Sequence, residues 1–544
     1  MERLTAGWRP YLLLSLLCLA LYLPGLAQVP PLDRDESRFV QATRQMLETG
    51  DFVRIQFQKE MRAKKPVGAY WLQAASVEAF ADAATRALWP FRLPSAVAAW
   101  AAALMTFAFG RHLFGRQAAL IAGALLATSL ILVSEAHQAK TDAILLATVV
   151  AAQGALGRFY MAARTQAPAP GPMVALVFWI AIGLSILVKG PVVPAVVLLT
   201  ILALAISDRG AAWLVGLRPF TGLLVAAAIA GPWFAAISQA TGGAFVGEAV
   251  KSDLLPKLLG AQESHGGKPG TFLALAAVIL WPGSLLLWPS LVAAWRQRHW
   301  PQIRFALAWA GPAWIMFEIV PTKLPHYVLP TFPALALLMG AAVIGGAPAL
   351  TARAAKVWYG LWALIALALA GAVIFAPIKF GAGLDPAGLP LAVAIAAAGL
   401  LAAVSAIRGR MTNAVLAAML AAIIAFPTVF GVVLPGLDRL WVSRAAAAML
   451  AARPHQGAVT VAGFAEPSLI FLLGTDTELG NGADAARRLQ DGPQALVLVS
   501  DREEEPFHQA CAGAGIRPVV AGTVSGFNYS RGKAVVLTAY RVEG

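Results

Sequence analysis

Long apolar runs recur along this chain, and they restrict its fold more than any other feature. A helix needs about 20 mostly apolar residues to cross the hydrocarbon core of a bilayer, and such runs follow one another from residue 11 to about residue 434. The 544-residue sequence is 59% hydrophobic and 13% charged, too few charges to cover a soluble protein of this size. The first run, Tyr11 to Ala27, ends without a clear small-x-small cleavage site, so we interpret it as a retained helix. The pattern predicts a polytopic α-helical membrane protein.

Arginine recurs in every second loop between these runs, and this predicts the topology. Under the positive-inside rule such loops are cytoplasmic, and Arg3 and Arg9 place the N-terminus on the same side. Counting runs between the loops gives about 13 spans, the last near 412–434, so the C-terminus is expected on the opposite side. The arginines and lysine that carry this assignment are Arg111, Arg116, Arg158, Arg164, Arg209, Arg218, Arg296, Arg298, Arg304, Arg353, Lys356, Arg408 and Arg410.

The formal net charge of +14 does not indicate a nucleic-acid-binding protein. The basic residues are scattered singly and in pairs between spans, and they form no single patch. Cys18 and Cys511 are too far apart in the chain for an obvious pairing, so the sequence supports neither a disulfide framework nor a cysteine metal cluster.

The first non-cytoplasmic loop, residues 28–93, is unusually rich in charge over residues 30–71. Asp35, Glu36 and Arg38 follow the first span. Asp35 and Glu36 fit a helix N-terminus, but Asp35 also fits a carboxylate at a substrate, acting as general base or orienting an acceptor. Farther along, Lys64 and Lys65 fit either a basic anchor on lipid headgroups or a binding site for a lipid phosphate.

Two helical patterns lie in this loop, at Glu36 to Leu47 and at Val67 to Phe80, and they predict amphipathic helices on the bilayer surface. After the last span, β-like runs at 458–464, 495–500, 518–527 and 534–540 alternate in part with helical segments. We therefore expect a transmembrane domain over residues 1–435 and a small α/β domain over residues 436–544.

Further charged groups are expected on the same outer side. Lys140 and Asp142 lie at the mouth of a span, where a helix cap and an active-site carboxylate are equally good interpretations. Glu263 and His265 lie in a later loop, and two such residues are a weak metal signal. Lys323 and Tyr327 open another span and could serve one phosphate or act as interfacial anchors. Lys189, at a helix break, could be structural.

These motifs together resemble a known family. The motif Asp-Glu-x-Arg-aromatic at 35–39, the motif Lys-Pro-x-Gly-x-Tyr-Trp at 65–71 and the motif Lys-Leu-Pro-x-Tyr-x-Leu-Pro at 323–330 are similar to those of the bacterial aminoarabinose transferases, which modify lipid A. That family belongs, with the protein O-mannosyltransferases, to the polyprenyl-phosphate-dependent glycosyltransferases of the GT-C type. The likeness runs from about residue 10 to residue 435.

The resemblance implies roles for individual residues. Asp35 matches an essential first-loop carboxylate and Asp142 a second acidic residue, while Lys65 and Tyr327 match residues that contact the carrier phosphate. The family motif is usually Glu-Lys-Pro, with the Glu as a zinc ligand. This chain has Lys64 there, and an ammonium group has no lone pair to offer a metal.

The expected site therefore has three groups of residues. The catalytic group is Asp35, Glu36 and Asp142. The group for the carrier phosphate or substrate is Arg38, Lys64, Lys65, Lys268, Lys323 and Tyr327, where Lys268 stands in for a family arginine. The metal group is His265, which resembles a metal-binding histidine, with Glu263. Whether any divalent cation binds stays open.

The function implied is inverting transfer of a sugar from an undecaprenyl-phosphate carrier to lipid A, lipopolysaccharide core or another envelope glycan. We expect a monomer in the bacterial inner membrane, with its N-terminus cytoplasmic, its C-terminal domain periplasmic and no nucleic-acid partner. Two alternatives stay open. One is a protein O-glycosyltransferase, which differs only in its acceptor. The other is a flippase or transporter of polyprenyl-linked sugars, which would need polar residues deep within several spans.

Overall fold

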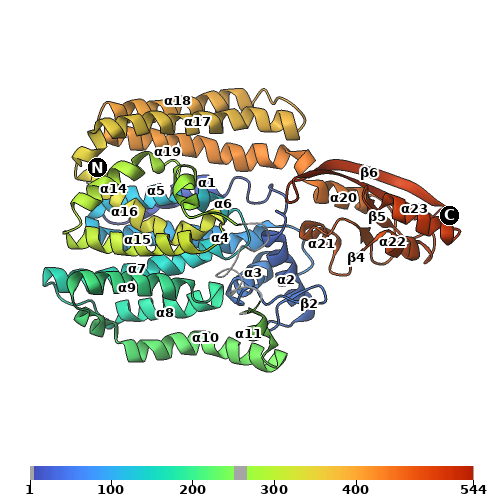
Figure 1. The fold of residues 1–544 in the computed structure, drawn as a ribbon, viewed down its shortest axis with the longest axis horizontal. Helices are drawn as coiled ribbons and strands as arrows, with labels where there is room; N and C mark the ends of the chain where they lie inside the picture. Colours follow the sequence, from blue (N-terminus) through green and yellow to red (C-terminus); the bar gives the residue numbers. More distant parts are fainter. Residues whose placement is uncertain (1–4, 250, 252–265, 543–544) are drawn as a thin grey trace.

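The computed structural model of the protein describes residues 5–249, 251 and 266–542. Figure 1 shows two parts. Long helices lie side by side in the larger part, and a smaller part with a β-sheet, formed by the C-terminal residues, extends from one end of it.

Among the described residues, eight helical segments are long and apolar enough to cross a membrane. They are α4 (Trp89–Phe114), α7 (Asp142–Thr165), α8 (Pro172–Lys189), α10 (Pro219–Thr241), Pro325–Ile344, which includes α16 (Phe332–Ile344), α17 (Arg353–Phe380), α18 (Gly388–Ile407) and Met411–Gly436, which includes α19 (Met411–Thr428). The helices α5 (Arg116–Ala127) and α6 (Leu130–Ala136) form a further candidate that is bent by 60°. The chain is thus a multi-span helical membrane protein, and the finer count of about 13 spans stays a prediction.

Further α-helices belong to the helical part. They are α1 (Arg9–Tyr22), α9 (Val192–Asp208), α11 (Ala244–Glu248), α13 (Thr271–Ile279), α14 (Ser284–Arg296) and α15 (Pro301–Ile319). Of these, α1 and α9 are apolar but have fewer than 18 residues.

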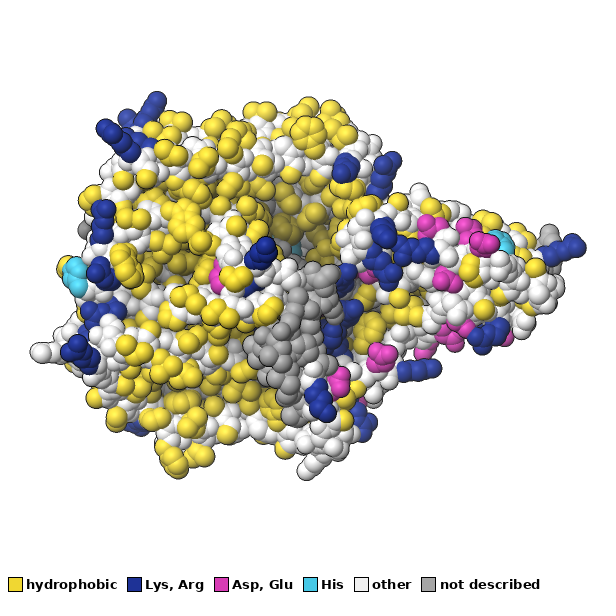
Figure 2. Space-filling view, viewed as in Figure 1, with side chains coloured by type: hydrophobic (Ala, Val, Ile, Leu, Met, Phe, Trp, Pro, Cys, Tyr) yellow, Lys and Arg dark blue, Asp and Glu magenta, His cyan; other side chains and the backbone are white. Residues whose placement is uncertain are grey.

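Charge is separated along the helical part, as a bilayer requires. Figure 2 shows hydrophobic side chains over most of its visible face and Lys and Arg at the end that carries the N-terminus. Arg164 near the end of α7 and Arg304 near the start of α15 both pair with Asp208 at the end of α9, Arg164 at 2.7 Å. These loops therefore meet at one end of the bundle, as the positive-inside pattern requires of loops that share a side.

The loop after α1 folds into two helices, α2 (Asp35–Thr49) and α3 (Gly68–Phe80), with a short hairpin of β1 (Gln56–Phe57) and β2 (Glu60–Met61) between them. Most of α2 is buried, and its covered residues include polar side chains such as Gln41 and Arg44. The reason is that α2 packs against both α3 and α21 (Pro467–Leu473), so that protein covers its polar face. The sequence pattern predicted a surface helix here because it could not reveal that second partner.

The C-terminal part contains a five-stranded sheet in the order β4-β3-β5-β7-β6. Its strands are β3 (Thr460–Ala462), β4 (Glu478–Gly480), β5 (Val497–Ser500), β6 (Pro518–Asn528) and β7 (Lys533–Val542). β3 pairs in parallel with β4 and β5, and β7 pairs antiparallel with β5 and β6. The helices of this part are α20 (Val442–Ala451), α21, α22 (Gly482–Leu489) and α23 (Glu504–Gly513).

Candidate functional site

Asp35 is the first residue of α2 and lies within reach of several positive charges. The preceding residue, Arg34, has a left-handed backbone (φ 68°), which turns the chain into the helix. The Asp35 side chain is exposed. The protein packed around its carboxyl group would by itself raise the pKa of Asp35, but the charges of Lys140 and then Arg62, with Lys65 contributing less, hold that pKa below its ordinary value. Asp35 is therefore a stable anion.

Glu36, the next residue, has a different environment. Its side chain and that of Arg92 in α4 are both fully buried, and the guanidinium forms a two-pronged pair with the carboxylate at 2.7 and 2.8 Å. Oε1 also accepts the Ala139 N–H at 2.9 Å, and Oε2 accepts the Leu32 N–H at 3.0 Å. Each oxygen of Glu36 is thus held by two donors, an arrangement that suits a structural group and leaves little for a substrate. These contacts favour a structural role for Glu36 over the predicted catalytic role.

A network of alternating charge joins the starts of two spans and the end of a third. Lys140 Nζ lies 2.9 Å from Glu135 Oε1, and Lys189 Nζ lies 2.5 Å from Asp142 Oδ1. The ring of His326 lies between the two carboxylates, with Nδ1 3.6 Å from Glu135 and Nε2 3.7 Å from Asp142. Burial alone would lower the pKa of Lys140, but Glu135 and then Asp142 raise it above its usual range. Lys140 therefore keeps its charge.

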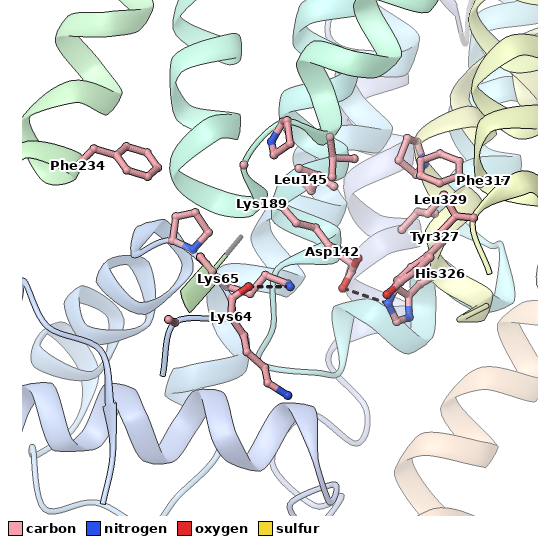
Figure 3. Close-up of a pocket in the computed structure, with 18 of the residues that line it drawn as sticks. Lys64, Lys65, Asp142, Leu145, Lys189, Phe234, Phe317, His326, Tyr327 and Leu329 are labelled. Carbon is pink, nitrogen blue, oxygen red and sulfur yellow. Dashed lines mark hydrogen bonds and ion pairs between the residues drawn. The ribbon is translucent and has the colours of Figure 1, made fainter. Parts of the chain in front are cut away.

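This network borders a cavity of about 320 Å³. Figure 3 shows Lys65, Asp142, Lys189, His326 and Tyr327 gathered around one part of it. Lys65 Nζ donates to the Lys64 carbonyl at 2.9 Å, and Lys189 Nζ lies 5.3 Å from the centre of the Tyr327 ring. The remaining wall is mainly apolar and includes Leu145, Pro191, Val192, Phe234, Phe245, Phe317, Val320, Leu329 and Pro330. The cavity thus combines a long apolar wall with ammonium groups at one part, which suits an amphiphile with an anionic head.

Lys323 is not placed for binding an anion in this cavity. Its Nζ donates to the carbonyl oxygens of Phe317 at 3.0 Å, Glu318 at 2.5 Å and Val320 at 2.6 Å. An ammonium group has three donors, and all three are used at the C-terminal end of α15, where the helix dipole favours a cation. The geometry therefore favours a structural role for Lys323.

The other predicted residues are distributed as follows. Lys64 lines the cavity, whereas the exposed Lys268 and the half-buried Arg38 are not part of its lining as the described residues define it. Glu263 and His265 lie outside the described residues. The structure thus brings Asp142, Lys64, Lys65 and Tyr327 to one cavity, and Asp35 lies within electrostatic reach of it.

The residues present do not fit a divalent cation well. Glu135, Asp142 and His326 offer ligand atoms within 4.8 Å of one another, the only such group of three or more among the described residues. Each of these carboxylates, however, already faces a lysine ammonium at 2.5–2.9 Å. A metal ion would have to displace those charges or tolerate them at close range, a cost that grows in a buried site. Lys64, where the family offers Glu, adds a further cation to the lining.

Motif reasoning missed part of this arrangement. Glu135, Lys140, Lys189 and His326 were not predicted as site residues, although Lys189 and Lys140 were noted as outward lysines near span ends. One signal was available. Buried charges at span ends are costly and need partners, so equal numbers of acids and lysines at neighbouring span ends predict that the acids pair with the lysines.

Comparison with known proteins gives sequence matches to one family model and to several named enzymes. The family model for dolichyl-phosphate-mannose-protein mannosyltransferase matches residues 11–214. An undecaprenyl phosphate-alpha-4-amino-4-deoxy-L-arabinose arabinosyl transferase of Aeromonas hydrophila is 28% identical over 369 residues, which cover 67% of this chain and 66% of that protein. The protein of the same name from Aeromonas salmonicida is 27% identical over 370 residues, with the same coverage. The chain thus spans about two thirds of the length of these relatives.

Solved structures also match this chain in fold. The crystal structure of ArnT from Cupriavidus metallidurans bound to undecaprenyl phosphate matches with a TM-score of 0.74 at 20% identity, covering 98% of each chain. The oligosaccharyltransferase of Archaeoglobus fulgidus matches with a TM-score of 0.50 at 12% identity, covering 92% of this chain and 70% of that one. These likenesses show a shared fold and confirm the resemblance expected from the motifs at 35–39, 65–71 and 323–330. This chain is similar in sequence to the bacterial aminoarabinose transferases over about two thirds of its length, and its residues 11–214 match the dolichyl-phosphate-mannose-protein mannosyltransferase family model.

Proposed function

We propose that this protein is an inverting glycosyltransferase that moves a sugar from an undecaprenyl-phosphate carrier to lipid A, lipopolysaccharide core or another envelope glycan. One observation carries the proposal: a mainly apolar cavity of about 320 Å³ whose lining includes Lys64, Lys65, Lys189 and Asp142. The names of the relatives, which include undecaprenyl phosphate arabinosyl transferases, support this choice of donor.

The cavity accounts for recognition of the donor. An isoprenoid chain gains free energy when apolar walls such as Phe234 and Phe317 remove it from water or loosely packed lipid. The phosphate needs cations and hydrogen-bond donors, and these are Lys65, Lys189 and the Tyr327 hydroxyl.

The chemistry follows from the charges. The bond between the anomeric carbon and the carrier phosphate oxygen breaks, while an oxygen of the acceptor attacks from the opposite face and inverts that carbon. Negative charge grows on the departing phosphate, and fixed ammonium groups stabilise it because they need no reorganisation during the reaction. No step requires a metal ion.

The electrostatics of Asp35 indicate its role. A carboxylate whose pKa is held below its ordinary value is a weak base, so we infer that Asp35 orients the acceptor and stabilises positive charge that develops on the sugar ring. An acceptor phosphate, already anionic, needs no proton removed.

We further propose the finer topology. About 13 spans place the N-terminus in the cytoplasm of a bacterium and the cavity at the periplasmic face of the inner membrane. In this arrangement residues 1–435 form the transmembrane domain, residues 436–544 form a periplasmic domain, and the protein acts as a monomer.

A second candidate differs only in the acceptor. The match of residues 11–214 to the mannosyltransferase family model is compatible with transfer to a protein hydroxyl. Mass spectrometry of lipid A and of envelope proteins from a deletion strain separates the two, because only one pool should lose a sugar. If the protein were a flippase, membranes of the deletion strain would still transfer sugar to their acceptors when the donor is supplied at the outer face.

The direct test is transfer by the purified protein in proteoliposomes, with Asp35→Asn against wild type. We expect Asp35→Asn to abolish transfer without loss of carrier binding or expression. The matched control is Glu60→Gln, which removes an exposed carboxylate from the same loop and should transfer normally. Full activity of a well-folded Asp35→Asn protein would remove Asp35 from the mechanism.

A further inference from the structure

The C-terminal part packs directly on the helix that begins with Asp35. Phe471 of α21 is fully buried among Val40 of α2 and Phe91 of α4, and the Phe91 and Phe471 rings meet edge to face at 5.8 Å. The Arg44 guanidinium donates to the Phe471 carbonyl at 3.1 Å. These contacts place α2 between the transmembrane helices and the C-terminal part.

A second set of contacts reaches the residues just before the catalytic position. The Asp33 N–H donates to the Tyr529 hydroxyl at 2.7 Å, and the Ser468 hydroxyl donates to the Asp33 carboxylate. The Arg34 guanidinium donates to the Ser530 carbonyl at 2.5 Å. Tyr529 and Ser530 lie in the turn between β6 and β7, 496 residues from their partners. Both residues that precede Asp35 are therefore held by the C-terminal part.

The backbone at this point needs such support. Arg34 has a φ of 68°, a region that L-residues with side chains rarely adopt unless their surroundings hold them there. The conformation of Arg34 sets where α2 starts and hence where the Asp35 carboxylate lies. A displacement of about 1 Å at a reacting group can cost on the order of 10²-fold in rate.

We infer that the C-terminal part is a positioning element for the reaction, and that Ser468 and Tyr529 act through Asp33 and Arg34 to hold Asp35 in place. This inference rests on the proposed function of Asp35. It gives the C-terminal part a role in catalysis although none of its residues lines the cavity as described.

The test uses the full-length protein and small substitutions. Tyr529→Phe removes the hydroxyl that accepts from Asp33 and keeps the ring, which packs 6.0 Å from the Trp441 ring. The matched control is Tyr540→Phe, because the Tyr540 hydroxyl bonds to Glu504 within the C-terminal part at 2.6 Å. Ser468→Ala, alone and with Tyr529→Phe, completes the set.

We expect the Ser468→Ala, Tyr529→Phe double variant to lower kcat by roughly 10- to 100-fold, with KM for the lipid-linked donor nearly unchanged, because the donor cavity is untouched. Tyr540→Phe should keep wild-type kcat. Hydrogen exchange should rise at residues 32–38 in the double variant and stay as in wild type in the control, which reports the loss of positioning without any activity assay.

The outcomes separate this inference from the proposed function. If Asp35→Asn abolishes transfer but the double variant keeps wild-type kcat and exchange, the positioning role is refuted and the function stands. If wild-type protein transfers no sugar, the proposed function is wrong, whereas raised exchange at residues 32–38 would still support the contact. A uniform fall in thermal stability with equal exchange changes across the C-terminal part would indicate a merely structural role.

Discussion

Two buried ion pairs in this protein, Glu36 with Arg92 and Glu135 with Lys140, differ in how many hydrogen-bond donors each carboxylate has. Both oxygens of Glu36 are filled, by Arg92 and by the N–H groups of Leu32 and Ala139. Glu135 has one oxygen beside Lys140, and its other oxygen has no hydrogen-bond partner within the described residues. Buried polar groups in a purely structural setting are normally satisfied. We propose that Glu135, beside the network that borders the cavity, belongs to the site, whereas the fully bonded Glu36 pair is structural.

The largest effect on stability is expected when the fully hydrogen-bonded Glu36–Arg92 pair is broken. Glu36→Gln leaves the buried Arg92 charge without its counterion, so we expect a loss of about 3–5 kcal/mol of stability. Thermal unfolding of the purified protein in detergent should show it, with Glu48→Gln, a more exposed carboxylate of the same helix paired with Arg44, as the milder control. A Glu36→Gln protein as stable as wild type but inactive would instead make Glu36 catalytic, reversing the comparison.

At the cavity, charge removal should affect rate more than stability. Lys189→Met deletes one of the ammonium groups that we propose to face the leaving phosphate, and we expect kcat to fall by roughly 10²–10³-fold. The melting temperature should also fall, because Asp142 loses the ammonium partner of its buried carboxylate, but by less than in Glu36→Gln, since His326 still lies near Asp142. Lys59→Met, at an exposed lysine of the first loop, serves as control and should keep full activity. Equal losses of activity in both variants would argue against a specific role for Lys189.

A smaller effect is expected from chelators. Because Lys140 and Lys189 already neutralise Glu135 and Asp142, EDTA should leave transfer essentially unchanged. Activity measured before and after chelation, alongside elemental analysis of the protein, checks this. Loss of transfer that zinc or magnesium restores would show that the lysines do not replace a cation.

The smallest effect concerns pH at the contact between Asp33 and the C-terminal part. Burial raises the pKa of Asp33 to about 6, although Ser468 donates to its carboxylate and lowers the pKa in part, while Glu466 raises it further. The folded state then binds more protons than the unfolded state between about pH 4 and 6, so stability should fall as pH rises through this window and level off above it. We expect a change on the order of 1 kcal/mol after solvent screening. Asp33→Asn should flatten this part of the stability profile, measured by thermal unfolding.

Sequence patterns predicted whether a segment forms a helix or a strand better than they predicted which other segments it packs against. Strand-like runs near 458–464, 495–500, 518–527 and 534–540 coincide with β3, β5, β6 and β7. The apolar segment that forms α21 was not predicted as a helix, and it is the element that covers α2. Local periodicity identifies an element, but it carries no information on which distant element will cover it.

The site shows the same limit at single residues. Asp35 and Glu36 are neighbours in one acidic motif, yet one is exposed and the other is fully buried against Arg92. Lys323 and Tyr327 share one motif, yet Lys323 caps α15 while Tyr327 lines the cavity. Motif reasoning found the right segments because charge at a span mouth is costly and therefore rare. It could not divide roles within a segment, since a turn of helix sends adjacent side chains to different faces.

Hydrophobicity and arginine placement, which are local properties, were sufficient to establish a multi-span helical protein with its unusual charges at span ends, because transfer into a bilayer depends on each segment by itself. The partners of those charges depended on the tertiary fold. Asp142 meets Lys189 across 47 residues, Glu36 meets Arg92 across 56, and Asp33 meets Tyr529 across 496. Only the packed chain brings such groups within hydrogen-bonding distance. The number of donors that reach each carboxylate then distinguishes the fully bonded Glu36 from Glu135, which has an oxygen without a described partner.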